Sequence, residues 1–322
     1  MFIADFLPPE PDIRWQLATQ MGVKHAIVKL NPELTGKNPP SDIDVLREAQ
    51  KRFEDHGFKL HGFEGDQMNM ERIKQDLPGR DEDLEQYQQM LRNMGELGIP
   101  LLCYNFMAQI GWFRTRTGIP DRGGALVSGF DVDDIKDEPL TEAGEISEEK
   151  MWDNYQYFLE AVLPVAEEAN IKMGMHPDDP PVTPLRGIGR ILTSPDNVRR
   201  AQALSDSPSH GVTFCQGCYT TMGADVRSLA REFAEHHKLF FIHWRDVTGT
   251  PERFQETFHD NGPTDMPAIL RFYKELGFNG PIRVDHVPTM AGESNTDPGY
   301  GAQGRLFAIG YLKGILDTLE ND

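Results

Sequence analysis

Four side chains able to bind a metal ion stand at the ends of four apolar, strand-like runs. The runs are IKMGMH, GVTFC, LFFIH and PIRVDH, and their last such residues are His176, Cys215, His243 and Asp285. The carboxyl ends of parallel strands meet on one face of an α/β fold, so we expect the four groups to converge there. Singly, a His or Cys in an apolar strand is more often a packed core residue. Their shared place in four consecutive runs predicts one divalent-metal site.

The mixture of nitrogen, sulfur and oxygen ligands limits which ion this site would hold. It suits Mn²⁺, Fe²⁺ or Zn²⁺ better than Mg²⁺, which prefers oxygen. Cys215 and Cys218 also form a CxxC pair, a pattern typical of thiol redox sites and of half a zinc ribbon. The chain has no second such pair, and Cys215 still belongs to its strand, whereas a redox CxxC normally begins a helix. We therefore favour metal binding by Cys215.

Two further titratable groups follow the last proposed ligand. His286 comes directly after Asp285, and Tyr300 lies in the Gly-rich stretch DPGYGAQG. Neighbouring strand residues point to opposite faces, so Asp285 and His286 both reach the site only if the strand ends or bulges there. Val287 and Pro288 are compatible with such an end. We expect His286 and Tyr300 to act on the substrate rather than on the metal; the alternative is a His bonded behind the barrel and a Tyr packed in a loop.

Eight short apolar runs, rich in β-branched and aromatic residues, alternate with longer amphipathic stretches. The runs span 2–6, 25–30, 58–64, 100–106, 171–176, 211–215, 239–244 and 281–286. Helix signals are clearest at 42–56, 81–97 and 147–169. Each parallel strand needs a crossover helix, so this alternation predicts a single (β/α)₈ TIM barrel over residues 1–322. A doubly wound sheet is the runner-up, but its dinucleotide fingerprint needs a Gly-rich turn where FIADFLPPEP supplies prolines.

The interval 107–146 interrupts this alternation after the fourth strand. It begins with aromatic and basic residues, including Trp112, Arg114 and Arg116, and it ends acidic. A loop this long in a compact domain is usually functional or disordered. We expect it to lie over the barrel mouth as a lid, to be partly mobile without ligand, and to close on an anionic substrate.

Several residues near the strand ends are candidates for contact with substrate. Tyr104 and Asn105 end the fourth strand, and we expect one to face the substrate and the other the helices. Asp178 and Asp179 lie in the stiff segment HPDDPP, where they either cap backbone amides or reach the substrate or the metal ligands. The proposed substrate-binding residues are Tyr104, Asn105, Trp112, Arg114, Asp178, Arg245 and Arg283.

The composition restricts the partners and the compartment. With 32 basic and 51 acidic residues the net charge is −19, which disfavours nucleic acid and anionic membranes as partners. An anionic substrate then needs local positive charge, from the metal ion and a few arginines. Three cysteines are too few for a disulfide framework, so we expect the reducing cytoplasm. The start lacks a signal-peptide pattern, and no apolar stretch reaches membrane-spanning length.

Together these motifs resemble those of the mannonate dehydratases, metal-dependent enzymes with xylose-isomerase-like barrels. From about residue 60 to the end, the resemblance runs in order through CYNFM, W-x-RT, MHPDDPP, FC-x-G, FIHWRDV, FHDNGPTDM, R-x-DH and PGYG. It implies a manganese or ferrous ion on the four strand-end ligands, with His286 and Tyr300 as the acid-base pair. It also implies the conversion of D-mannonate, a sugar acid, to 2-keto-3-deoxy-D-gluconate.

The chain departs from this family pattern at several positions. Gly111 stands where an Asp usually precedes the Trp, Val284 replaces a Pro, and Val287-Pro288 replaces a Gly-Arg that helps to recognise substrate. The loop FEGDQMNMERIKQ lacks an expected His. These departures concern substrate contacts, so they bear on the identity of the sugar acid more than on the chemistry.

The residue types suit the removal of water across C2 and C3 of an aldonic acid. Such an enzyme removes a weakly acidic proton next to a carboxylate and protonates a poor leaving hydroxyl. A divalent ion stabilises the enediolate-like intermediate as a Lewis acid. We expect Tyr300 to take the C2 proton and His286 to protonate the C3 hydroxyl.

Other functions remain open at this point. A metal-dependent sugar isomerase or epimerase would use the same barrel with a carboxylate base, and a dehydratase of a related sugar acid would keep the chemistry. A non-catalytic carbohydrate or metal sensor would need neither His286 nor Tyr300 near the ion. A metal-dependent nuclease would present a basic groove, which the net charge disfavours. We also expect a homo-oligomer, a dimer or a tetramer.

Overall fold

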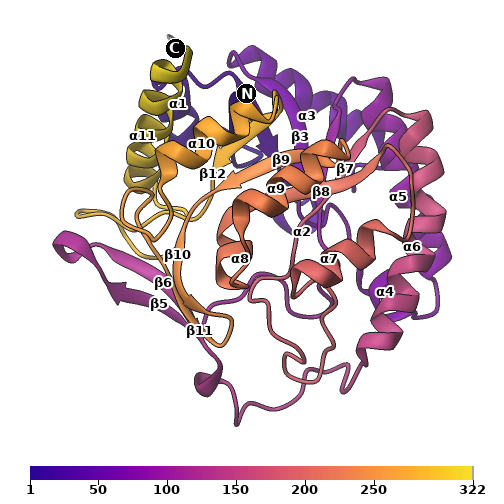
Figure 1. Cartoon of the computed structure of the whole chain (residues 1–322). Helices are drawn as coiled ribbons and strands as arrows, with labels where there is room; N and C mark the ends of the chain where they lie inside the picture. The colour runs from indigo at the N-terminus through magenta and orange to yellow at the C-terminus, as the bar shows by residue number, and fades with distance from the viewer. Residues whose placement is uncertain (321–322) are drawn as a thin grey trace.

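The eight predicted strand runs form a closed barrel of parallel strands in the computed structural model, which describes residues 1–320 (Figure 1). Around the barrel the order is β1, β2, β3, β4, β7, β8, β9 and β12, and β12 pairs with β1 to close it. The strands are β1 (Phe2–Phe6), β2 (His25–Val28), β3 (Lys59–Glu64), β4 (Leu101–Tyr104), β7 (Lys172–Met175), β8 (His210–Cys215), β9 (Leu239–Trp244) and β12 (Pro281–Val284). The predicted (β/α)₈ barrel is confirmed, and the doubly wound sheet is wrong.

Helices surround the barrel and begin and end close to the predicted residues (Figure 1). Asp42 and Ser147 cap α3 and α6 by accepting hydrogen bonds from backbone N–H groups two and three residues later. The helices are α1 (Ile13–Gln20), α2 (Pro32–Thr35), α3 (Ile43–Asp55), α4 (Glu71–Gln75), α5 (Arg80–Glu96), α6 (Glu148–Glu168), α7 (Pro195–Gln202), α8 (Gln216–Thr221), α9 (Val226–Glu235), α10 (Met266–Glu275) and α11 (Ala302–Glu320). Two 3₁₀ turns, η1 (Arg122–Gly124) and η2 (Val132–Asp134), lie in the insertion.

Side chains of the barrel strands alternate between two apolar layers. A small layer fills the inside of the barrel and includes Ile27, Cys103 and Phe241, and a larger layer lies between the strands and the helices. A side chain two positions beyond an interior residue points inward again. By this rule the inward-facing residues at the barrel mouth include Lys29, Asn105 and His243.

The insertion after β4 is not an irregular loop, as the sequence suggested, but half of a second sheet. Its strands β5 (Arg116–Pro120) and β6 (Leu126–Asp131) form a hairpin, which pairs with a second hairpin after β9, made of β10 (Val247–Thr250) and β11 (Arg253–Glu256). The antiparallel order is β10-β11-β6-β5 (Figure 1). This sheet has its own small core around Phe130 and Phe254. It therefore ties together two segments that leave the barrel at different strands.

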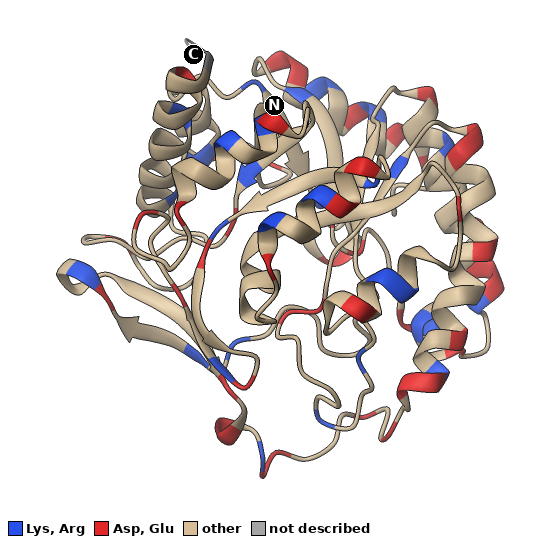
Figure 2. Ribbon diagram, in the orientation of Figure 1, with Lys and Arg blue, Asp and Glu red and all other residues tan. Residues whose placement is uncertain are grey.

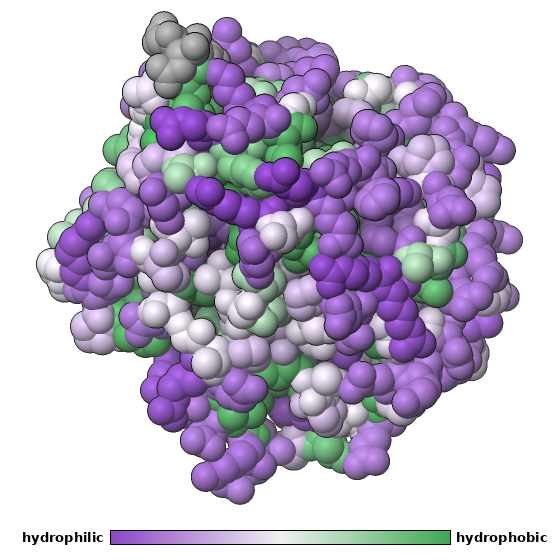
Figure 3. All heavy atoms as spheres, viewed as in Figure 1, coloured by the Kyte–Doolittle hydropathy of each residue, from purple (hydrophilic) through white to green (hydrophobic). Residues whose placement is uncertain are grey.

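Charged side chains are concentrated on the outer helices. Figure 2 shows acidic and basic residues interleaved along them, while the barrel strands in view carry few charges. The face seen in Figure 3 is mostly hydrophilic, with hydrophobic residues in small separate patches. Within residues 1–320, no helix has both the length and the apolar character needed to cross a membrane.

Candidate metal and acid-base site

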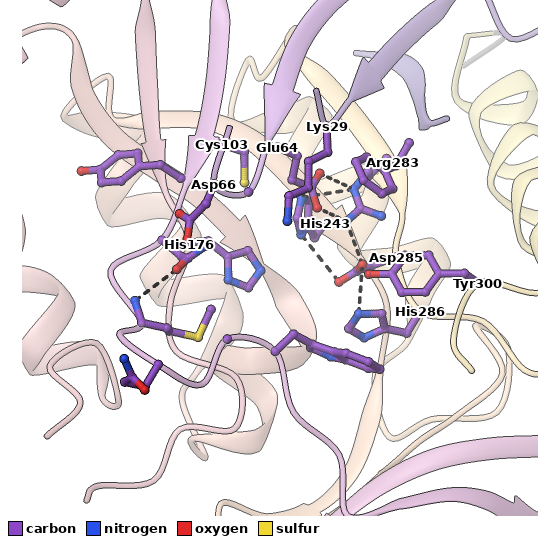
Figure 4. Close-up of a pocket in the computed structure, with 18 of the residues that line it drawn as sticks. Lys29, Glu64, Asp66, Cys103, His176, His243, Arg283, Asp285, His286 and Tyr300 are labelled. Atoms are coloured by element: carbon purple, nitrogen blue, oxygen red, sulfur yellow. Dashed lines mark hydrogen bonds and ion pairs between the residues drawn. The ribbon is translucent and has the colours of Figure 1, made fainter. Parts of the chain in front are cut away.

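A cavity of about 350 Å³ opens at the carboxyl ends of the barrel strands (Figure 4). Polar side chains from many strands converge on it, and an apolar edge comes from Phe6 and Trp112. Its polar lining includes Lys29, Glu64, Asp66, Asn105, His176, His243, Arg283, Asp285, His286 and Tyr300. This place is where barrels of this type carry their active sites.

The four predicted metal ligands come together at one side of this cavity. One ligand atom each from His176, Cys215, His243 and Asp285 lies within 4.8 Å of the others. Cys215 Sγ is 3.9 Å, and His243 Nδ1 3.6 Å, from Asp285 Oδ2. The Nδ1 atom of His243 is buried and has no hydrogen-bond partner. A buried nitrogen without a partner destabilises the folded state unless another group binds it. This donor set therefore fits a metal ion.

Neighbouring groups fix which nitrogen of each histidine is available. His176 Nδ1 lies 2.6 Å from the carbonyl oxygen of Pro177, which can only accept, so Nδ1 carries the proton and Nε2 is free. His243 Nε2 lies 3.3 Å from Glu64 Oε2. Arg283 Nε is 3.2 Å from that nitrogen but donates to Glu64 at the shorter distance of 2.9 Å. Glu64 therefore orients His243 with Nδ1 toward the other ligands.

Charges around Cys215 favour its thiolate, the form that binds metals. Burial alone would raise the pKa of this thiol, but Cys218, Arg245 and His176 bring it well below its usual range. Burial and the Cys215 thiolate raise the pKa of Cys218, which lies 3.3 Å from an Arg245 nitrogen. Cys215 ends β8 and is also the residue before α8, so the argument that no helix begins at the CxxC pair is wrong. Cys215, at the ligand position, is nevertheless the more readily ionised of the two thiols.

The expected end of the last strand is present, because β12 stops at Val284. Asp285 and His286 consequently both line the cavity, as Figure 4 shows, with Tyr300 beside them. The rings of His286 and Tyr300 are 5.5 Å apart between centroids, and Trp112 packs against His286 at 4.7 Å. His286 thus lies beside both Asp285 and the Tyr300 ring, within the same cavity.

Glu256, which the sequence analysis missed, holds the outer nitrogen of His286. Its Oε1 atom lies 3.0 Å from His286 Nδ1. Burial would raise the pKa of Glu256, but Arg245, His286 and Arg114 outweigh it and lower the pKa to about 2. The ionised carboxylate accepts a hydrogen bond from Nδ1–H, and Nε2 then faces Asp285 at 3.6 Å.

Four of the predicted substrate-binding residues line the cavity: Tyr104, Asn105, Trp112 and Arg283. Tyr104 contributes to its wall, but the Tyr104 hydroxyl is 2.9 Å from Tyr155 of α6, on the helix side of the strand. Strand alternation turns Tyr104 outward and Asn105 inward, so one residue faces the helices and the other the cavity, as expected. A substrate contact by the Tyr104 hydroxyl is not supported.

Arg114, Arg245 and Asp178 lie behind the cavity wall and do not line it, so their predicted contact with substrate is not supported either. Arg114 and Arg245 each pair with Asp179 and Glu256 at 2.6–2.8 Å, in a fully buried cluster. The Asp178 carboxylate accepts a hydrogen bond from the Leu192 N–H at 2.8 Å. Asp178 therefore caps a backbone amide, which is one of the two roles considered for it from the sequence. These arginines neutralise buried carboxylates that would otherwise be costly to ionise.

Comparison with known proteins gives a consistent result over nearly the whole chain. The family model for D-mannonate dehydratase (UxuA) matches residues 16–144 and 138–322. Mannonate dehydratase 2 of Halalkalibacterium halodurans is 35% identical over 333 residues, covering 95% of this chain and 94% of that protein. Mannonate dehydratase of Enterococcus faecalis is 31% identical, covering 95% and 96%.

Solved structures give the same result for the fold. The crystal structure of mannonate dehydratase from Streptococcus suis serotype 2 superposes with a TM-score of 0.90 at 30% identity, covering 100% of this chain and 95% of that one. D-psicose 3-epimerase from Clostridium cellulolyticum H10 has a TM-score of 0.60 at 12% identity, covering 100% and 99%. The second similarity concerns the barrel fold alone.

Proposed function

This chain belongs to the D-mannonate dehydratase family, and from that premise we propose that it converts D-mannonate to 2-keto-3-deoxy-D-gluconate with loss of one water. The reaction is that of a hydro-lyase. One observation carries the proposal for the site: the four ligand atoms within 4.8 Å lie in the same cavity as His286 and Tyr300. A sensor would have no need of this pair beside the ligands.

His176, Cys215, His243 and Asp285 would hold one divalent ion, and we propose Mn²⁺ or Fe²⁺. When bound, the ion supplies Lewis-acid stabilisation for charge that develops on the substrate carboxylate. Asp285 is ionised for this role: burial would raise its pKa, but Arg283, His286 and His243 bring it well below the usual range.

Tyr300 and His286 would move the protons. Tyr300 takes the C2 proton, the bond from C3 to its hydroxyl breaks, and His286 gives its Nε2 proton to the leaving oxygen, so that water departs and the enol product becomes the 2-keto acid. Burial and Asp285 raise the pKa of the Tyr300 phenol. Its deprotonated form therefore needs positive charge nearby, which Arg283 and Arg305 provide.

A dehydratase of a related sugar acid is the second candidate function, and free space in the cavity supports it. Gly111, one of the departures from the family pattern, lines the cavity, and a Cβ at this position would meet no atom within 4 Å. The space where relatives place an Asp side chain is thus available to a differently shaped substrate.

The test is a screen of aldonic acids with the purified chain loaded with Mn²⁺ or Fe²⁺. We expect D-mannonate to give a 2-keto-3-deoxy acid whose mass is lower by one water. A product of unchanged mass would identify an isomerase or epimerase, and turnover of another aldonic acid in place of D-mannonate would support the second candidate.

Three further properties belong to this proposal. The segment 107–146 would act as a lid, because Gly111 and Trp112 line the cavity and the β5-β6 hairpin follows them. The chain would work in the cytoplasm, where Cys215 stays reduced. A dimer or tetramer stays a prediction.

Glu256→Gln is expected to lower kcat about ten- to a hundredfold, the range found when a carboxylate that orients a functional histidine is removed. The amide has nearly the same size but no charge to hold the Nδ1 proton of His286. Steady-state kinetics would measure the change, with thermal unfolding to confirm that the fold persists. Glu252→Gln, an exposed carboxylate on the same hairpin, is the matched control. Unchanged kcat in Glu256→Gln would contradict the orienting role.

A further inference from the structure

Lys29 places an ammonium group in the cavity that no residue in the described part of the chain neutralises. It follows β2 by one residue and points inward, two positions after the interior Ile27. Figure 4 shows its side chain reaching toward the site beside Glu64 and Arg283. Among residues 1–320, no hydrogen bond or ion pair engages its Nζ atom. It is partly buried, so this charge is not simply solvated at the surface.

The other cations in and around the cavity are already committed. Arg283 donates to Glu64 at 2.5 and 2.9 Å and pairs with Asp285 at 2.9 Å. Lys74, behind the lining, pairs with Asp66 at 2.7 Å and also donates to Asn105. Lys29 is therefore the cation within the described lining that is free to receive a negatively charged ligand group.

The barrel order places Lys29 across the mouth from the metal ligands. Four steps separate β2 from β8 in either direction around the barrel, and the ligands come from β7, β8, β9 and the end of β12. Both groups line the same cavity, so a carboxylate of a sugar acid bound there could lie between the ammonium and the ligand group. In a chain of net charge −19, such a local cation gives an anionic substrate a favourable place to bind.

We propose that Lys29 pairs with a carboxylate of the sugar acid and makes the cavity selective for acids over neutral sugars. This inference rests on the proposed function and specifies how its substrate class is recognised. A neutral sugar would leave the ammonium unpaired, which is the usual physical basis for strong rejection of an analogue. The carboxylate is either that of C1 or a second one at the far end of the chain, as in an aldaric acid.

The experiment compares Lys29→Met, which keeps the apolar stem, with Lys29→Arg, which keeps the charge. Lys24→Met, an exposed lysine before the same strand, is the matched control. Dissociation constants for D-mannonate, its dicarboxylate D-mannarate and the neutral polyol D-mannitol are measured by calorimetry on metal-loaded protein, in a Tyr300→Phe background to prevent turnover. Lys29→Met should weaken acid binding by about tenfold or more and leave D-mannitol binding unchanged.

The pattern of losses identifies the carboxylate. A loss for both acids assigns the C1 carboxylate, and a loss for D-mannarate alone assigns the far end; Lys29→Arg should retain most of the affinity. Unchanged binding of both acids, or an equal loss for D-mannitol, overturns the inference. If wild-type protein dehydrates no sugar acid, the proposed function fails, while these binding constants still decide the role of Lys29.

Discussion

Tyr300→Phe and His286→Asn should each lower kcat by roughly a hundredfold or more, the scale of lost general acid-base catalysis. Both side chains line the cavity, with ring centroids 5.5 Å apart, and neither belongs to the group of four ligands. Phe removes only the hydroxyl, and Asn keeps one hydrogen-bonding group near the position of the imidazole Nδ1. Metal content and substrate affinity should therefore stay close to wild type in both variants.

Single-turnover kinetics, together with metal analysis, separates this effect from loss of binding. Tyr157→Phe is a suitable control, because its hydroxyl bonds to Asp81 on the outside of the barrel at 2.8 Å. Near-normal turnover in Tyr300→Phe or in His286→Asn would remove that residue from the mechanism. A loss that follows metal content would instead mean that the residue supports the ion.

Cys215→Ala and His243→Ala should lose most of their bound metal while the barrel remains folded. Removing a partner that merely orients a ligand costs about ten- to a hundredfold in metal affinity, so removing a ligand should cost more. Cys215→Ser offers a weaker oxygen donor and should retain metal poorly or change its preference among ions. Elemental analysis after gel filtration, with thermal unfolding as a check of the fold, measures both outcomes.

Cys103→Ala is the informative control for this experiment. Cys103 also lines the cavity and forms, with Glu64 and His243, a second group of residues able to bind a metal. Burial raises the pKa of its thiol, so it is a poor ligand where Cys215 is a good one. Full metal occupancy in both Cys215→Ala and His243→Ala would contradict the proposed site, and loss of metal in Cys103→Ala alone would move the ion to the second group.

The barrel and its ligand group could be predicted because both follow from local patterns. Each strand is a short run of β-branched and aromatic residues, and each ligand stands where such a run ends. The two-residue alternation also carries information that the sequence analysis did not use. Lys29 follows the interior Ile27 by two positions, so its inward direction was readable from HAIVKL.

The buried charge cluster could not be predicted in the same way. Arg114 meets Asp179 and Glu256, which are 65 and 142 residues away in the chain, so only the folded barrel brings them together. Arg residues beside proposed lid and strand segments were reasonable candidates for binding an anionic substrate. In the structure these arginines instead form ion pairs with carboxylates of the protein itself.

The hairpin that carries Glu256 was missed because its sequence has weak strand signals. Residues 247–256, VTGTPERFQE, include a Pro and several charged residues, and only Val247 and Phe254 are large apolar residues that become buried. The strands form because β6 supplies a partner, pairing Phe254 with Phe130 and Gln255 with Gly129. Tertiary context thus overrode local propensity.

The pairing of β6 with β11 has a consequence for how this enzyme can vary. Glu256 ends β11, so the strand that comes from the insertion sets the direction of a side chain that holds His286. Shifting that pairing by one residue would turn Glu256 to the opposite face of the sheet. Gly129 allows the close approach, since a Cβ there would lie 2.7 Å from the Phe254 carbonyl oxygen. A single-residue insertion or deletion within β6 would therefore misalign His286, the proposed proton donor.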